Sequence, residues 1–115
     1  MSALKCSIGP SGVPEITVND LNEQKAKVQI VDVRRPDEFS GELGHIDGAM
    51  FSTLETDLET TLEKLPKDKI YVFVCRSGGH SGHATQMAQQ KGFKDVYNMK
   101  GGMLAWNAAG FDVKR

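Results

Sequence analysis

The stretch that decides the fold is residues 70–91, with the sequence IYVFVCRSGGHSGHATQMAQQK. Its first five residues, 70–74, form an unbroken apolar run, which is typical of a strand buried on both faces of a parallel sheet. The later part has apolar residues at helical spacing: Ala84, Met87 and Ala88. Gly92 is a typical residue to follow the end of such a helix. Cys75 therefore lies where a central strand ends, shortly before a helix.

This position suits a reactive thiolate. Ligands of parallel sheets bind outside the carboxyl ends of the strands, and helix N-termini offer unpaired N–H groups to anions. A free cysteine is only about 3% thiolate at pH 7, so the loop must favour the charged form. Gly78 and Gly79 can adopt positive φ and bring several N–H groups close to the sulfur of Cys75, with help from Arg76. The alternative is a buried, inert cysteine.

The composition limits the class of protein. A chain of 115 residues is expected to form one domain, and 39% hydrophobic and 25% charged residues are ordinary values for a globular protein. The net charge of −1 gives no reason to expect nucleic acid or a membrane as a partner. No apolar run reaches membrane-spanning length, and residues 1–15 lack the apolar core of a secretory signal. Two cysteines far apart form no disulfide framework, so a cytoplasmic location is expected.

Residues 1–14 are rich in glycine, proline and serine and are expected to form a flexible segment, with the folded domain at residues 15–115. Cys6 lies in the flexible segment. It is interpreted as an incidental exposed thiol, and the alternative is that it resolves an oxidised Cys75.

Strands and helices alternate along the rest of the chain. Strands are expected at 15–16, 28–33, within 45–51, and at 70–74 and 94–98. Helices are expected at 18–25, from Pro36 to the break at Gly41, at 57–65, in the stretch after Ser81 that ends at Lys91, and from the Gly101-Gly102 pair to Gly110. Thr17 and Thr56 are the predicted N-caps of two of these helices. This order predicts an α/β fold, with right-handed crossovers and helices on both faces of a parallel sheet.

Four motifs, in order and covering roughly residues 15–111, resemble those of single-domain rhodaneses. They are IVDVR at 30–34 with Pro36, Glu38 and Phe39; GHIDGA at 44–49; VCRSG at 74–78; and GGMLAW at 101–106. The resemblance implies a three-layer rhodanese-like fold, with a five-stranded parallel sheet between helices. It also implies that Cys75 carries a sulfur atom as a persulfide. The loop that would encircle this sulfur consists of Arg76, Ser77, Gly78, Gly79, His80 and Ser81.

The activity implied by the resemblance is sulfur transfer without a cofactor. The donor would be thiosulfate or a persulfide, and the acceptor cyanide, a small thiol or a protein thiol. Family loops commonly carry a second arginine where this chain has His80. Because histidine titrates near neutral pH, thiosulfate use is expected to fall as the pH rises and His80 loses its charge.

The loop side chains have individual expectations. Arg76 would hold an anionic donor by a bidentate contact. The hydroxyls of Ser77 and Ser81 would bond the thiolate or persulfide, although Ser81 would serve equally well as an N-cap. No metal site is expected, since His80 and His83 lack a Cys-x2-Cys pair. A second group of residues is expected to act structurally: Asp32, Arg34, His45 and Trp106.

Two other functions remain open. A phosphatase or arsenate reductase needs a Cys-x5-Arg loop, but the sixth residue after Cys75 is Ser81, so this function is disfavoured. A non-catalytic rhodanese-like module that binds partners or senses redox state is the main alternative, and the retained cysteine argues against it.

Overall fold

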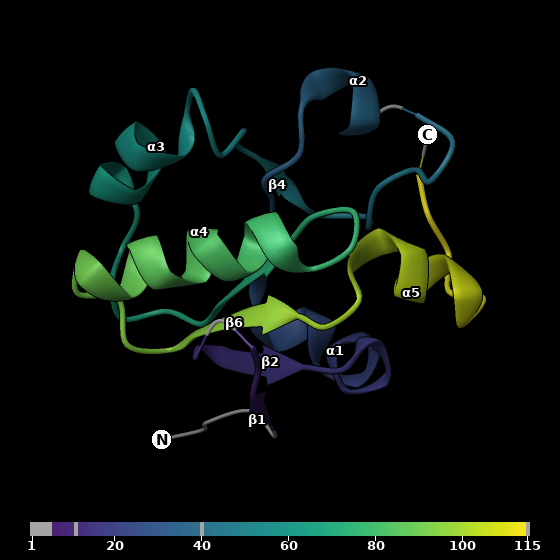
Figure 1. The fold of residues 1–115 in the computed structure, drawn as a ribbon, viewed down its shortest axis with the longest axis horizontal. Helices are drawn as coiled ribbons and strands as arrows, with labels where there is room; N and C mark the ends of the chain where they lie inside the picture. Colours follow the sequence, from purple (N-terminus) through teal and green to yellow (C-terminus); the bar gives the residue numbers. More distant parts are fainter. Residues whose placement is uncertain (1–5, 11, 40, 115) are drawn as a thin grey trace.

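A computed structural model describes residues 6–10, 12–39 and 41–114 of the protein. The strands within these residues form one sheet in the order β1-β2-β6-β5-β3-β4 (Figure 1). Their bounds are β1 Ser7–Ile8, β2 Pro14–Ile16, β3 Gln29–Asp32, β4 Met50–Phe51, β5 Tyr71–Val74 and β6 Val96–Met99. The five strands from β2 to β4 in this order run parallel, and β1 pairs antiparallel with β2. The predicted α/β fold is confirmed, with one short strand more than expected.

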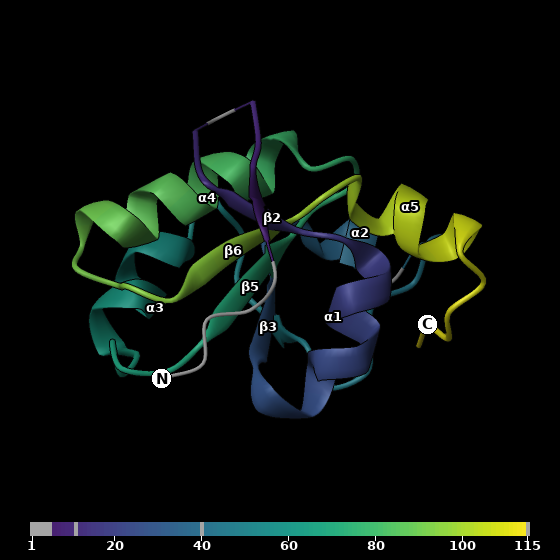
Figure 2. The same cartoon turned by 90° about the horizontal axis from the view of Figure 1, so that it is seen from below.

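Helices cover both faces of this sheet. Their bounds are α1 Val18–Gln24, α2 Pro36–Phe39, α3 Leu58–Lys64, α4 Gly79–Gln90 and α5 Gly102–Ala108, and a 3-10 turn, η1, spans Lys25–Lys27. Figure 2 shows α3 and α4 on one side of the strands and α1 and α5 on the other. Within the described ranges, no helix combines the length and the apolar character needed to cross a bilayer.

The alternation of side chains along β5 divides the core into two layers. Val72 and Val74 pack with residues of α1 and α5, including Leu21 and Trp106. Tyr71, Phe73 and Cys75 lie in the other layer, which contains these residues of α3 and α4: Leu58, Leu62, Ala84 and Ala88. Because successive side chains of a strand point to opposite faces, residue 75 falls on the α3/α4 side of the sheet. Trp106 is fully buried, as predicted.

The two predicted N-caps have different outcomes. Thr17 caps α1 as expected, because its hydroxyl accepts a hydrogen bond from Asp20 N–H at 3.1 Å. The prediction for Thr56 is wrong, since α3 begins at Leu58 and Asp57 is its N-cap. The carbonyl of Thr53 accepts bonds from three successive N–H groups, those of residues 56–58. Thr56 therefore lies within a turn that precedes the helix, and the helix begins one residue later than the sequence pattern predicts.

The N-terminal segment contains a hairpin that the sequence pattern did not predict. Ser7 pairs with Glu15 across this hairpin, in which Gly9 N–H donates to the Val13 carbonyl at 3.0 Å. A Cβ on Gly9 would lie 2.1 Å from the Glu15 carboxyl carbon, so this glycine lets the Glu15 side chain lie against the hairpin. Residues 1–5 and 11 lie outside the described residues, and a domain boundary near residue 15 stays a prediction.

Candidate functional site around Cys75

Cys75 follows the last residue of β5, which lies between β6 and β3 in the middle of the sheet. Its side chain is buried, and two groups contact its sulfur. The Gly78 N–H donates to Sγ at 3.0 Å, and the Ser81 hydroxyl oxygen lies 3.2 Å from Sγ. The sequence predicted several converging N–H groups; among the contacts described for Sγ, one comes from a backbone amide and one from a hydroxyl.

The start of α5 holds the backbone of the sulfur loop, which we define as residues 75–81. Met103 N–H donates to the Cys75 carbonyl at 2.8 Å, and Leu104 N–H donates to the Arg76 carbonyl at 3.0 Å. Gly102 has φ +60, and a Cβ there would lie 2.4 Å from the Arg76 carbonyl oxygen. A residue with a side chain therefore cannot replace Gly102 without moving the sulfur loop.

Helix α4 begins inside the sulfur loop. Gly78 is its N-cap, with φ +106, a left-handed conformation that favours glycine. The first N–H groups of a helix have no partner inside it and carry partial positive charge, so this end of α4 favours an anion beside Sγ. Ser81 lies in the first turn of the helix, so of its two predicted roles the N-cap is wrong. Its hydroxyl is directed at Cys75 and Asn98 instead.

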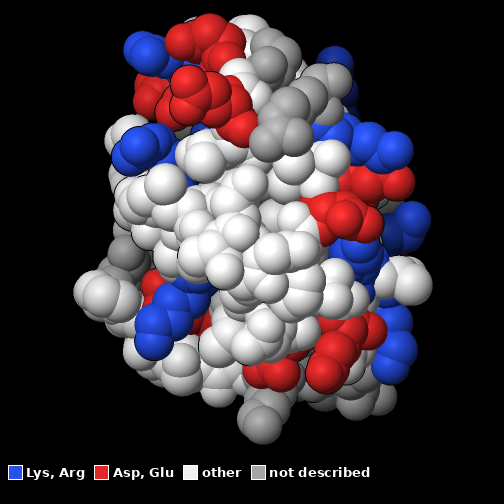
Figure 3. Space-filling model, turned by 90° about the vertical axis from the view of Figure 1, so that its right-hand side faces the viewer, with Lys and Arg blue, Asp and Glu red and all other residues white. Residues whose placement is uncertain are grey.

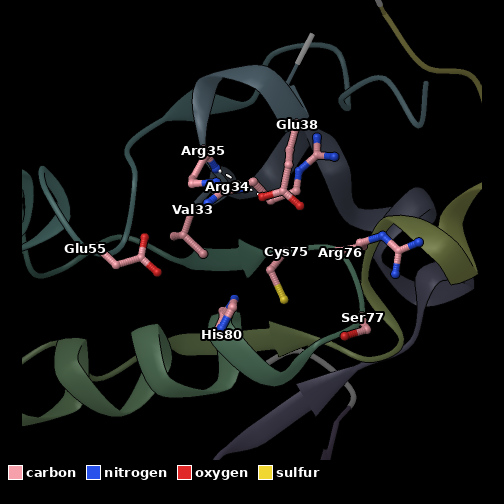
Figure 4. A pocket seen from close by; sticks show the side chains of 9 residues that line it. All are labelled: Val33, Arg34, Arg35, Glu38, Glu55, Cys75, Arg76, Ser77 and His80. Atoms are coloured by element: carbon pink, nitrogen blue, oxygen red, sulfur yellow. Dashed lines mark hydrogen bonds between the residues drawn. The ribbon is translucent and has the colours of Figure 1, made fainter. Parts of the chain in front are cut away.

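A cavity of about 300 Å³ opens beside the sulfur. Its lining residues come from the ends of β3 and β5 and from neighbouring segments: Val33, Arg34, Arg35, Glu38, Glu55, Cys75, Arg76, Ser77 and His80. Figure 4 shows the cysteine side chain between α4 and the end of β3, while Arg76 and Ser77 extend away from the sulfur. A small anion or thiol can thus reach Cys75 from the cavity.

The charged groups of the cavity differ in how they are paired. The Arg34 guanidinium is buried and donates to both carboxylate oxygens of Asp32, at 2.9 and 2.8 Å. Arg35 lies 3.7 Å from the exposed Asp37. Arg76 makes none of the described ion pairs, which leaves its guanidinium available to an anion. Two carboxylates, those of Glu38 and Glu55, also face this cavity, so its lining carries both signs of charge.

The structure brings most of the predicted site residues together around one sulfur. Gly78 and Ser81 contact Sγ, Gly79 begins α4, and the remaining three line the cavity: Arg76, Ser77 and His80. Among the described contacts, none joins the Ser77 hydroxyl to the sulfur. In the part of the chain that the structure describes, no cluster of three or more potential metal ligands is present.

Sequence reasoning named Glu38 only as part of a family motif, and it missed Glu55 and Asn98. Asn98 is 1% exposed, and its side chain hydrogen-bonds to Ser81 and to the Gly78 carbonyl. A polar residue in the apolar run Val96–Met99 was the available signal for it. Glu55 comes from the irregular segment before α3, and no local pattern in the sequence indicates that it lines the cavity beside Cys75.

Two residues with expected structural roles have them. Asp32 pairs with the buried Arg34, and His45 stacks on Phe39 with 3.9 Å between ring centroids. The His45 Nδ1 atom also lies 3.0 Å from the Phe39 carbonyl oxygen, which fixes the turn that follows α2. Cys6 is exposed and has a free thiol.

The side of the molecule that carries α5 has an uncharged centre. Figure 3 shows a large uncharged area at the centre of this side, with acidic and basic groups around it. The sequence agrees, because residues 101–111 contain no charged side chain.

Comparisons of this chain with known families and proteins indicate the same family. Residues 17–109 match the family described as Rhodanese-like domain. A protein of Shewanella oneidensis named thiosulfate sulfurtransferase GlpE is 37% identical over 101 residues, which cover 86% of this chain and 97% of that protein. This relative, of nearly the same length, supports sulfur transfer as the class of activity.

Solved structures agree with the fold. A rhodanese-like domain protein from Staphylococcus aureus is 32% identical with a TM-score of 0.74, over 88% of this chain and 98% of that chain. A Rhodopseudomonas palustris protein, described as of unknown function and a possible tyrosine phosphatase, is 32% identical with a TM-score of 0.80, over 90% and 86% of the two chains. The protein whose Cys75 follows the central strand is therefore a member of the rhodanese-like family.

Proposed function

We propose that the protein is a sulfurtransferase that carries a sulfane sulfur as a persulfide on Cys75. The observation that carries this proposal is the position of Sγ. It is buried at the N-terminus of α4, it receives the Gly78 N–H at 3.0 Å, and it adjoins a cavity of about 300 Å³. Such surroundings favour a sulfur anion over a neutral thiol, and only the anion attacks a sulfur donor.

The reaction has two steps. In the first, the Cys75 thiolate attacks the outer sulfur of thiosulfate, a new S–S bond forms, and sulfite leaves with the electron pair of the broken S–S bond. In the second, cyanide or a thiolate attacks the outer sulfur of the persulfide. The S–S bond to Cys75 breaks, and its electron pair returns to Sγ as a thiolate. The net result is a ping-pong transfer in which no electrons enter or leave.

The residues around the cavity have complementary roles in this proposal. The outer sulfur of the persulfide carries the negative charge and lies beside the first turn of α4, whose N–H groups lack helical partners. Arg76 binds the sulfonate end of thiosulfate when its exposed side chain turns into the cavity. His80, in the same turn of α4, adds positive charge when it is protonated.

A phosphatase is less well supported. A phosphatase of the Cys-x5-Arg type needs a cation at the sixth residue after the cysteine, where it closes the loop around a tetrahedral oxyanion. Here that residue is Ser81, which is completely buried against Sγ. The serine supplies one neutral hydroxyl and no charge, so the loop lacks the group that phosphoryl transfer requires.

The partners follow from the same chemistry. The donor is thiosulfate or an organic persulfide, and the acceptor is cyanide, a small thiol or a protein thiol in the cytoplasm. No cofactor takes part in either step. A non-catalytic module that binds partners or senses redox state is the competing function, and turnover separates the two.

The test is steady-state conversion of thiosulfate and cyanide to sulfite and thiocyanate. The native protein and a Cys6→Ser variant are expected to turn over equally, whereas Cys75→Ser is expected to have no activity above background. Equal activity of Cys75→Ser and the native protein would contradict the persulfide route. Absence of turnover in the native protein with every donor and acceptor named above would favour the binding module.

A further inference from the structure

Asn98, on the strand next to β5, contacts both residues that touch the Cys75 sulfur. Its Nδ2 donates to the Gly78 carbonyl at 2.9 Å, and its Oδ1 is in close hydrogen-bond contact with the Ser81 hydroxyl. Cys75, Ser81 and Asn98 are 3%, 0% and 1% exposed, so water does not compete for these bonds. The sulfur is therefore linked to β6 through a buried polar chain.

The orientation of the Asn98 amide is fixed by its partners. Nδ2 also donates to Glu15 Oε2 at 2.9 Å, and residues 15 and 98 are register partners of β2 and β6. The Gly78 carbonyl and an ionised carboxylate can only accept hydrogen bonds, so the amide must turn its NH2 group towards them. Oδ1 then faces Ser81, and because it is only an acceptor, it must take the hydroxyl proton of Ser81.

This arrangement sets up a competition for one proton. When Cys75 is a neutral thiol, its S–H donates to Ser81 Oγ while the Ser81 O–H donates to Asn98, and every group is satisfied. When Cys75 is a thiolate, Sγ needs a donor as well, but Ser81 has a single hydroxyl proton. Either the thiolate keeps only the Gly78 N–H as a donor, or Asn98 Oδ1 loses the Ser81 hydroxyl, and both outcomes cost free energy in a buried site.

The persulfide escapes this competition. In a persulfide the negative charge lies on the outer sulfur, and Sγ, bonded to two atoms, is only a weak acceptor. Ser81 then keeps its bond to Asn98. Asn98 therefore disfavours the resting thiolate without disfavouring the loaded form.

We infer that Asn98 is a positioning residue that withholds the Ser81 proton from Cys75, which keeps the thiolate weakly solvated and reactive and favours the persulfide. This inference rests on the proposed function only for its consequence in sulfur transfer. The proton competition itself is a property of the unloaded protein.

The test measures the pH dependence of alkylation by iodoacetamide in a Cys6→Ser background, where Cys75 is the remaining thiol. We define the alkylation midpoint as the pH at which the rate is half-maximal. In Asn98→Ala the Ser81 proton is free to bond the thiolate, so the midpoint is expected to fall by about one pH unit. A more stable thiolate is less nucleophilic, so the rate of sulfur loading well above the midpoint is expected to fall about threefold.

Asn107→Ala is the matched control. Asn107 Nδ2 donates to two carbonyls, of Leu43 at 3.1 Å and Met103 at 2.8 Å, so its removal also breaks an asparagine clamp between segments. None of the described contacts joins it to the sulfur. Asn107→Ala is expected to leave the midpoint unchanged even if it lowers the melting temperature.

A double mutant separates proton competition from general loosening. In a Ser81→Ala background there is no hydroxyl proton to release, so adding Asn98→Ala is expected to leave the midpoint where Ser81→Ala puts it. A fall of similar size in both backgrounds would overturn the inference. An unchanged or raised midpoint in Asn98→Ala alone would overturn it too.

A second pair of variants covers the case in which Asn98→Ala does not fold. Glu15→Gln and Glu15→Ala both remove the carboxylate charge at a partly exposed position, but only the glutamine keeps an acceptor for Asn98 Nδ2. The midpoint of Glu15→Ala is expected below that of Glu15→Gln, because the freed amide holds the Ser81 proton less firmly. Equal midpoints would contradict the inference. If Cys75 never accepts sulfur while these midpoints shift as expected, the proposed function fails and the inference about the thiolate stands.

Discussion

Two neighbouring parallel strands, β3 and β5, end at the same edge of the sheet, and an arginine lies two residues beyond each end. Arg34 follows β3, is 4% exposed and is held by both oxygens of Asp32 and by the Gly44 carbonyl at 2.7 Å. Arg76 follows β5, is exposed and lines the cavity beside Cys75. The same position relative to a strand thus produces a structural ion pair in one loop and an available cation in the other.

The difference lies in what each loop contains. After β3, the carboxylate partner is Asp32, the last residue of the strand, so the buried charge of Arg34 is paired within the protein. The loop after β5 contains a cysteine and two glycines but no carboxylate. The positive charge of Arg76 is therefore available to pair with an anionic ligand. Removing the carboxylate that pairs with Arg34 should therefore lower the stability of the protein. Removing the side chain of Arg76 should instead lower its activity.

The largest effect is expected from Asp32→Ala. It leaves the Arg34 guanidinium buried without its carboxylate, and breaking such a pair typically costs about 3–5 kcal/mol of unfolding free energy. Urea denaturation measures this loss. Asp37→Ala, which removes the carboxylate 3.7 Å from the exposed Arg35, is the matched control and should cost at most about 1 kcal/mol. Equal losses in the two variants would refute the assigned difference between the arginines.

Arg76→Ala is expected to have the opposite profile. Its unfolding free energy should stay within about 0.5 kcal/mol of the native value, since the side chain is exposed and makes none of the described ion pairs. A hydrogen bond to a charged group contributes about 1.5–3 kcal/mol, so kcat/KM for thiosulfate should fall at least tenfold. Arg35→Ala provides the comparison. If both variants lose activity to the same extent, Arg76 has no special role in donor binding.

The His80→Arg variant sharpens the comparison by making the β5 loop permanently cationic. In the native protein, kcat/KM for thiosulfate should fall as the pH rises and His80 becomes neutral, by a few-fold for one exposed charge near a dianion. In His80→Arg this decrease should be absent. The measurement is a pair of pH profiles, each normalised to the alkylation rate of Cys75 at the same pH. Superimposable profiles would contradict a role of the His80 charge in thiosulfate use.

The smallest effect is expected at the other end of β5. Burial raises the pKa of Tyr71, and the Asp68 carboxylate raises it further. The Tyr71 hydroxyl donates to the Pro66 carbonyl at 2.7 Å, a bond that requires the neutral form. A raised pKa in the folded state means that this stabilisation is complete below the unfolded pKa of about 10 and is lost as the pH rises through the folded value.

Tyr71→Phe should therefore lower stability at neutral pH by about 1 kcal/mol and flatten its decrease above about pH 10. Thermal unfolding followed between pH 8 and pH 11 compares the two proteins. Sulfur transfer at neutral pH should be the same in both, since this end of β5 lies away from the sulfur. A parallel decrease in the two stability curves would show that another group controls alkaline unfolding.

The sequence was most informative where one local pattern decides the structure. The apolar run at residues 70–74 predicted β5 and its central place, and the Thr17 cap followed from a short-range hydrogen bond. Thr56 and Ser81 fit the N-cap pattern equally well but do not cap helices. A turn around Thr53 displaces one cap, and the bond of Ser81 to Asn98 draws the other side chain inwards. A local turn decided the first case, and a contact between segments distant in the sequence decided the second.

The site residues, like the helix caps, were predicted only where a local sequence pattern indicates them. The residues of the sulfur loop are consecutive in the chain, so the motif at residues 74–78 and the positions directly after it contain all of them. Glu55, which lines the cavity, and Asn98, which contacts Ser81 of the loop, come from segments that lie outside the loop in the sequence. Their proximity depends on the strand order β6-β5-β3-β4, which the alternation of strands and helices does not determine.

The most direct test of Cys75 as the sulfur carrier is the intact mass of the protein after exposure to thiosulfate. The native protein is predicted to gain the mass of one sulfur atom, which dithiothreitol removes, and Cys6→Ser should gain it equally. Cys75→Ser should gain nothing. A native protein whose mass does not change, or a sulfur atom found on Cys6, would contradict the assignment of Cys75 as the sulfur carrier.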